Sequence, residues 1–204
     1  MNFDWIAPHY WWIERLGMGR TLERRRRWFL PSLEHARRAL VLGDGDGRFL
    51  RELLRHNRLV HADYVDVSGR MLELARRKAG EKRVFYQKAD ARIAAFPESE
   101  YDLIATHFFL DCFGPSEMDD LIARIAAAAK PEARWVVSEF CISTIPARLL
   151  VRALYLFFRI TAGLKTRRLV DHRPVLRSHG FRLISSSRAR GGLVVSELWE
   201  RGSL

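Results

Sequence analysis

The sequence predicts an α/β fold in which a mostly parallel, doubly wound sheet carries helices on both faces. Short apolar or β-branched runs alternate with helix-patterned segments that are long enough to serve as crossover connections. The chain has 204 residues, 48% hydrophobic and 29% charged, which favours one globular domain over a disordered or multi-domain protein. The predicted parallel strands span residues 39–42, 59–66, 83–87, 101–106 and 134–140.

Polar residues mark the starts of two predicted crossover helices. Ser68 precedes the apolar residues Met71 and Leu72, and Ser116 with Asp119 forms a capping box before the next apolar run. Both positions are typical of helix N-termini.

The pattern changes toward the end of the chain. Residues 181–187 and 193–199 read as two strands joined by a turn that contains Gly191 and Gly192. We therefore expect an antiparallel pair at one edge of the sheet.

The first 38 residues have a different composition, rich in Trp and Arg. A basic run, Arg24 to Arg27, is flanked by Leu22 and Trp28, which predicts an amphipathic helical cap, residues 1–38, over the sheet. The run itself is either a solvated helix face or a contact for phosphate or lipid head groups. Residues 39–204 are predicted to form the main domain, with a helical insertion over residues 145–178.

Charge and targeting signals limit the environments that suit the chain. The net charge is +11 and the isoelectric point near 10.4, which predicts attraction to nucleic acid, acidic lipid or a phosphorylated ligand. We see no signal peptide, and the longest apolar stretch, residues 145–164, carries Arg148, Arg152 and Arg159, too many charges for a comfortable membrane span. Only two cysteines are present. We expect a cytoplasmic protein that can lie on a membrane without crossing it.

The most informative segment is a glycine loop. The strand at 39–42 runs into Gly43-Asp44-Gly45-Asp46-Gly47 and then into a helix. Glycines allow a tight turn and close approach of a ligand, and the following helix presents N–H groups. The third glycine of a dinucleotide fingerprint would fall on Arg48, and no P-loop Lys-Ser/Thr pair follows.

Two later strands end on carboxylates. Asp66 could accept both hydroxyls of a ribose, or it could be an acid at a helix start beside Ser68. Asp90 could take the exocyclic amine of adenine while the N–H of Ala91 meets a ring nitrogen, or it could be a turn residue. Three such strand ends together indicate a ligand that contains a nucleoside.

In combination these segments resemble the class I S-adenosylmethionine-dependent methyltransferases. The glycine loop is similar to the family's first motif, and residues 65–68, 89–91, 101–104 and 129–131 are similar to the later ones. The resemblance implies a Rossmann-like methyltransferase with a seven-stranded sheet whose last strand is antiparallel, and S-adenosyl-L-methionine as cofactor. It assigns cofactor binding to Tyr10, Gly43, Asp44, Gly45, Gly47, Asp66, Val67, Met71, Asp90, Ala91 and His107.

Within that family, residues 3–10 and 191–194 are similar to segments of the ubiquinone and menaquinone biosynthesis methyltransferases. One position departs from the family pattern. Val41 stands where an acid normally precedes the first glycine by two positions, so Asp44 or a backbone carbonyl would have to accept the methionine amine. The resemblance also implies that Tyr10 closes over the cofactor carboxylate.

Methyl transfer is an in-line displacement, so positioning matters most, and a phenol or enediol acceptor also benefits from a base. His107 and Asp111 follow the fourth strand and are predicted to be catalytic, although His107 could equally be a packed side chain. His9, His172 and Glu139 are weaker candidates. The histidines and cysteines have no metal-ligand spacing, so no metal site is predicted.

A predicted helix at 146–162 has about twice the apolar surface that packing on a sheet needs. Either this helix packs between the sheet and the N-terminal cap, or its extra surface meets an apolar substrate, a second subunit or a lipid surface. We therefore expect methyl transfer to a small apolar acceptor, quinone-like or isoprenoid, with peripheral contact to an anionic membrane and room for a homodimer. The alternatives are an RNA or protein methyltransferase and a non-catalytic cofactor-binding protein. Residues 111–114 lack the Asn-Pro-Pro-Tyr pattern of base amino-methylases, which makes nucleic acid the less favoured partner.

Overall fold

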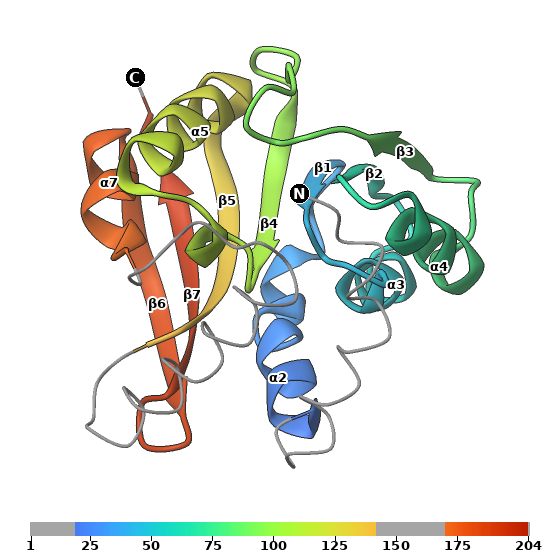
Figure 1. Ribbon diagram of the computed structural model, residues 1–204, viewed down its shortest axis with the longest axis horizontal. Coiled ribbons are helices and arrows are strands. Elements are labelled where there is room, and N and C mark those ends of the chain that lie inside the picture. Colours follow the sequence, from blue (N-terminus) through green and yellow to red (C-terminus); the bar gives the residue numbers. More distant parts are fainter. Residues whose placement is uncertain (1–18, 142–169, 204) are drawn as a thin grey trace.

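The computed structural model describes residues 19–141 and 170–203 and contains one seven-stranded sheet of order β3-β2-β1-β4-β5-β7-β6 (Figure 1). All neighbouring strands pair in parallel except β7, which runs antiparallel to both β5 and β6. The predicted sheet with an antiparallel last strand is thus confirmed. The strands are β1 Arg38–Leu42, β2 His61–Asp66, β3 Val84–Lys88, β4 Tyr101–His107, β5 Ala129–Phe140, β6 Phe181–Ala189 and β7 Val194–Arg201.

Helices cover both faces of this sheet (Figure 1). Successive strand residues point to opposite faces: Leu40 packs in the core with α5 and α7, whereas its neighbour Val41 packs with α3 and α4. The doubly wound architecture follows from this alternation. The helices are α2 Gly19–Arg26, α3 Arg48–His56, α4 Gly69–Ala79, α5 Pro115–Ala128 and α7 His172–Ser178, with short 3-10 turns η3 Leu30–Leu33 and η4 Leu110–Cys112. Among the described residues, no helix is long and apolar enough to span a bilayer.

One of the two predicted helix starts is confirmed, and the other is wrong. The Ser68 hydroxyl accepts a hydrogen bond from the backbone N of Met71 at 3.2 Å and caps α4, as predicted. The predicted capping box at Ser116 is wrong, because α5 begins at Pro115, and Glu117 accepts the N–H of Gly114 at 3.0 Å. Proline suits the first helical position, since it has no N–H to satisfy and its φ is already helical.

Strand β5 starts earlier than predicted. It begins at Ala129, which pairs with Tyr101, and the register then shifts before Leu103 pairs with Arg134. Glu132 has a φ of +61° in this irregular stretch. The residues read as a turn before the strand are therefore an irregular first part of it.

Helix α2 provides the described part of the N-terminal cap. The Ser196 hydroxyl of β7 donates to the backbone O of Arg25 at 3.0 Å, and Arg25 Nη1 donates to the Ser187 hydroxyl of β6 at 2.8 Å. The basic run is divided, since Arg25 and Arg26 are buried while Arg24 and Arg27 are exposed. Either reading of the run as a surface feature therefore applies only to its two outer residues. The cap boundary at residue 38 stays a prediction, and the expected helix at 146–162 lies outside the described residues.

Two glycines of the loop after β1 allow a matched test of packing between α3 and α4. Gly45 and Gly47 have φ values of +65° and +75°, so alanine is strained at either position. They differ in the space around them: a Cβ at Gly47 would lie 2.7 Å from the Cβ and 2.9 Å from the Cα of Ala75, whereas nothing lies within 4 Å at Gly45.

Gly45→Ala should lower the free energy of unfolding by about 1–2 kcal/mol, the cost of a left-handed backbone. Gly47→Ala should lower it by roughly 1–3 kcal/mol more, because α4 must move away. Urea unfolding of both variants measures the difference. Equal losses would show that the backbone of α4 does not confine this position.

Candidate functional site

The glycine loop between β1 and α3 is fixed by side chains from both sides. Gly43, Gly45 and Gly47 all have positive φ. The Tyr64 hydroxyl of β2 donates to the backbone O of Gly45 at 2.6 Å, and Asp44 Oδ2 accepts from the backbone N of Leu50 at 3.1 Å. The loop is therefore a defined tight turn, as its glycines predicted, and its role as a ligand cradle stays a prediction. The N–H of Leu50, in the first turn of α3, is already used by Asp44, so the start of this helix does not simply present free donors to a ligand.

Asp44 itself is buried, with 3% of its surface exposed. Burial raises the pKa of its carboxyl to about 7, and the nearby Arg26 only partly opposes this. One carboxylate oxygen caps α3, but Oδ1 has no hydrogen-bond partner and lies 3.9 Å from Arg26 Nε. The structure thus places at the loop a carboxylate with one oxygen still available for a bond.

Asp66 ends β2 next to the loop, because Leu42 and Val65 are paired neighbours in the sheet. Its Oδ1 accepts the N–H of Ser68 at 2.9 Å, so it takes part in the turn that starts α4. Val67 is half-buried and Met71 is buried. Both interpretations of Asp66, ribose ligand and helix-start acid, are compatible with this position, and its binding role stays a prediction.

Asp90 is held by its neighbour. Arg92 Nε lies 3.0 Å from each carboxylate oxygen of Asp90, and the hydrogen bond from Arg92 lowers the pKa of Asp90. Ala91 is buried. The carboxylate predicted to receive an adenine amine therefore already carries a guanidinium, and an amine donor would have to share or displace that pair.

The structure separates the two residues predicted to be catalytic. His107 ends β4, is 2% exposed and packs its ring 4.4 Å from that of Phe49 on α3. Neither ring nitrogen has a hydrogen-bond partner in the described part of the chain, and burial, with the nearby charge of Arg26, lowers its pKa well below the usual value. Asp111 instead lines a pocket that His107 does not reach. Tyr10 and His9 lie outside the described residues.

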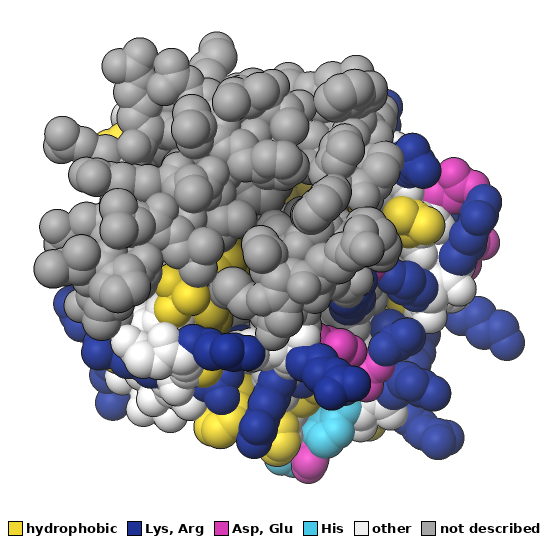
Figure 2. Space-filling model, turned by 60° about the horizontal axis from the view of Figure 1, so that its bottom comes forward, with side chains coloured by type: hydrophobic (Ala, Val, Ile, Leu, Met, Phe, Trp, Pro, Cys, Tyr) yellow, Lys and Arg dark blue, Asp and Glu magenta, His cyan; other side chains and the backbone are white. Residues whose placement is uncertain are grey.

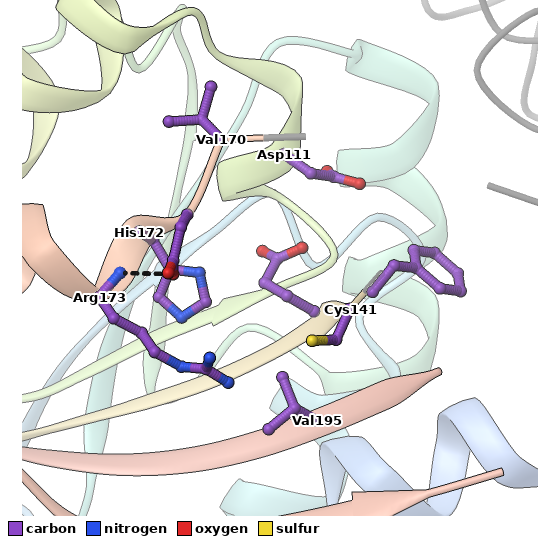
Figure 3. A pocket seen from close by; sticks show the side chains of 9 residues that line it. Asp111, Cys141, Val170, His172, Arg173 and Val195 are labelled. Atoms are coloured by element: carbon purple, nitrogen blue, oxygen red, sulfur yellow. Dashed lines mark hydrogen bonds between the residues drawn. The ribbon is translucent and has the colours of Figure 1, made fainter. Parts of the chain in front are cut away.

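That pocket, of about 220 Å³, lies beyond the ends of β4 and β5. Asp111, Cys141 and His172 come from three separate segments of the chain and border it (Figure 3). Apolar and ionisable side chains are mixed in its wall. The lining residues are Asp111, Glu139, Phe140, Cys141, Val170, Asp171, His172, Arg173 and Val195.

Glu139 is the most deeply buried acid of this pocket, with 2% of its surface exposed. Its Oε1 accepts the backbone N–H groups of Phe109 and Leu110 at 3.0 and 2.9 Å, whereas Oε2 has no hydrogen-bond partner among the described residues. Burial, followed by the charge of Asp111, raises the pKa of Glu139 well above its usual value. The raised pKa favours the protonated form of this carboxyl, in which Oε2 can donate a hydrogen bond.

Glu197 holds two residues of the pocket wall, His172 and Arg173, in place. This acid was not identified from the sequence. It is fully buried on β7, where it contacts His172 Nε2 at 2.8 Å, Arg173 Nε at 2.6 Å and Trp199 Nε1 at 3.0 Å. Burial would raise the pKa of Glu197, but the bonds from His172 and Arg173 hold it below the ordinary value. The sequence did hold a signal for this residue: an acid within the apolar run at 193–199 must find partners if the strand is buried.

Comparison with known proteins agrees with this geometry. Residues 39–132 match the methyltransferase-domain family. The fold is that of an S-adenosylmethionine-dependent methyltransferase from Mesorhizobium loti, with a TM-score of 0.70 and 20% identity over 88% of this chain and 100% of that one. The predicted resemblance to that class and the Rossmann-like methyltransferase fold are thereby confirmed.

Two curated relatives match in sequence. A demethylmenaquinone methyltransferase of Deinococcus radiodurans is 30% identical over 142 residues, covering 68% of this chain and 58% of that protein. Polyamine aminopropyltransferase 2 of Bacillus anthracis is 32% identical over 125 residues, covering 54% of this chain and 34% of the relative. The chain therefore spans less than two thirds of the length of either relative.

The buried acid of the glycine loop predicts a pH-dependent stability. Because its pKa is about 7 in the folded domain and 3.8 ordinarily, the folded state binds the Asp44 proton more tightly than the unfolded state does. The free energy of unfolding should therefore fall as pH rises from about 4 to about 7. In Asp44→Asn this contribution is absent, so the stability of the variant relative to the unsubstituted protein should increase between pH 5 and 8, by about 2–3 kcal/mol.

Urea unfolding at several pH values measures this difference, and Asp46→Asn is the control. The pKa of Asp46 is lowered because bonds from Lys78 and Arg48 outweigh its burial, so its effect should be constant above pH 5. Parallel stability curves for Asp44→Asn and the unsubstituted protein would contradict the raised pKa.

Proposed function

We propose that the protein is an S-adenosylmethionine-dependent methyltransferase that methylates a small apolar acceptor of the quinone-like or isoprenoid kind. The observation that carries the proposal is the placement of two features at one edge of the sheet. The glycine cradle follows β1, and the pocket that Asp111 and Glu139 line follows β4 and β5. Ligands of doubly wound sheets bind in the crevice at the carboxyl ends of their strands.

The cradle fits the cofactor. Its glycines bring backbone close to a ligand, and a buried oxygen of Asp44 is left without a hydrogen bond. Asp66 would hold the ribose and the N–H of Ala91 the adenine ring. When bound, the cofactor supplies a methyl group on a positively charged sulfur.

The pocket supports a small acceptor with an apolar body and one ionisable group. Its volume of about 220 Å³ is below the usual range for drug-sized ligands, about 300–1,000 Å³. Phe140, Val170 and Val195 would pack against the body. An acceptor of this kind partitions into membranes, and Lys and Arg outnumber acidic side chains on much of the surface in Figure 2, so we propose an anionic membrane as its source.

Asp111 and Glu139 would manage the proton of the acceptor. Glu139, protonated and anchored through Oε1, donates from Oε2 and holds the acceptor hydroxyl in place. Asp111 takes the hydroxyl proton as the oxygen–methyl bond forms and the sulfur–methyl electron pair stays on sulfur. The demethylmenaquinone methyltransferase relative supports an acceptor of this class.

Transfer of labelled methyl from S-adenosylmethionine into candidate quinols tests the proposal. Asp111→Asn should lower kcat by about 10²- to 10⁴-fold, because the acceptor loses its base. Glu139→Gln should mainly raise KM, because the amide still donates a hydrogen bond. Neither should change the affinity for S-adenosylhomocysteine.

Glu98→Gln, at an exposed position away from the pocket, is the control and should behave like the unsubstituted enzyme. Unchanged turnover in both pocket variants would remove Asp111 and Glu139 from the reaction. Absence of calorimetric binding of either S-adenosyl compound to the folded protein would remove the methyltransferase proposal itself.

A further inference from the structure

Three buried polar side chains lie beside the glycine loop without forming hydrogen bonds to one another. Arg26, Asp44 and His107 are 7%, 3% and 2% exposed. Within the described part of the chain, Arg26 Nε, Asp44 Oδ1 and both ring nitrogens of His107 have no hydrogen-bond partner. Native proteins leave few buried polar atoms unpaired, so such a concentration in one place indicates a polar ligand.

The cluster is assembled from three elements that are distant in sequence. Arg26 is the last residue of α2, Asp44 lies in the loop after β1, and His107 ends β4. The Arg26 guanidinium lies 5.2 Å from the ring centre of Phe108, which holds it over the ends of the strands. All three side chains therefore stand at the edge of the sheet where the cradle opens.

A purely structural ion pair explains this arrangement poorly. The 3.9 Å between Arg26 Nε and Asp44 Oδ1 is too long for a hydrogen bond, although a buried pair is favourable only when its geometry is good and its remaining atoms are bonded. The capping of α3 uses Asp44 Oδ2 alone. One oxygen of the acid and one nitrogen of the base are thus left for a third group.

The groups that would satisfy the cluster are a carboxylate and an ammonium on one small molecule. A guanidinium matches a carboxylate with two parallel hydrogen bonds, and an ammonium donates to a carboxylate or to an unprotonated imidazole. An α-amino acid carries both groups on one carbon.

We infer that Arg26 binds the α-carboxylate of the S-adenosylmethionine cofactor and that Asp44 and His107 receive its α-ammonium group, an inference that rests on the proposed function. Arg26 is then a cofactor-binding residue supplied by the cap helix. His107 belongs to the cofactor side of the site, and the pocket acids belong to the acceptor side.

Calorimetry with two ligands tests the assignment. S-adenosylhomocysteine carries the amino-acid end, whereas 5′-methylthioadenosine has the same nucleoside and sulfur without it. Arg26→Met keeps an apolar stem over Phe108 but removes the charge. This substitution should lower the affinity for S-adenosylhomocysteine by about 10- to 100-fold and change the affinity for methylthioadenosine by less than about twofold.

Two further variants complete the experiment. Arg24→Met, at an exposed position of the same helix, should change neither affinity. Arg26→Lys should lie between Arg26→Met and the unsubstituted protein, because an ammonium cannot make the paired bonds. If Arg26→Met does not fold, Arg26→Lys and Asp44→Asn decide in its place, since each should still weaken only S-adenosylhomocysteine.

An equal loss of affinity for both ligands would overturn the inference, because it would show that Arg26 supports the loop and does not touch the amino-acid end of the ligand. Unchanged affinity for S-adenosylhomocysteine would overturn it as well. Failure of the folded, unsubstituted protein to bind either ligand is a separate result, which rejects the proposed function.

Discussion

The left-handed backbone of the glycine loop is the constraint on which the rest of the site depends. Gly43, Gly45 and Gly47 turn the chain from β1 into α3 within five residues, and only glycine adopts such φ values without strain. Asp44 and Tyr64 then hold that turn from the helix side and the sheet side. The loop is therefore held from both sides, and it fixes the positions of Asp44 and of α3 relative to the strand ends.

The order of the strands explains why the site forms there. The chain builds β2 and β3 on one side of β1 and β4 and β5 on the other, so the crossover connections diverge between β1 and β4. Sheets of this kind open a crevice at such a switch point. Here Phe109, just after β4, lies so close to Gly43 that an added Cβ would come within 2.1 Å of its Cδ2. The unsatisfied cluster of Arg26, Asp44 and His107 lies beside this same contact.

Local sequence patterns predicted the fold and the glycine turn well, because both depend on short-range rules. Alternation of strands and helices gives the parallel sheet, and glycines followed by a helix give the loop. Ser68 could be assigned as a cap from its neighbours alone. A strand-ending acid such as Asp66 could likewise be placed at the ligand edge, because parallel strands end on the same side.

Contacts between residues that are distant along the chain could not be predicted from the sequence. Arg25 and Arg26 read as part of a basic surface, yet they turn inward toward β6 and the glycine loop. The burial of Glu197 depends on His172, Arg173 and Trp199 reaching one carboxylate across two elements. His107 and Asp111 are separated because His107 is the last residue of β4, whereas Asp111 lies in the following turn η4 and lines the pocket. Each of these depends on tertiary packing, which a periodic pattern does not encode.

Amide hydrogen exchange, with and without S-adenosylhomocysteine, tests most directly whether the glycine loop is the cofactor cradle. A bound ligand at the switch point should slow exchange in residues 43–50 and 107–110 and leave the hairpin at 185–193 unchanged. Protection confined to other segments, or none at ligand concentrations that saturate calorimetric binding, would contradict the assignment.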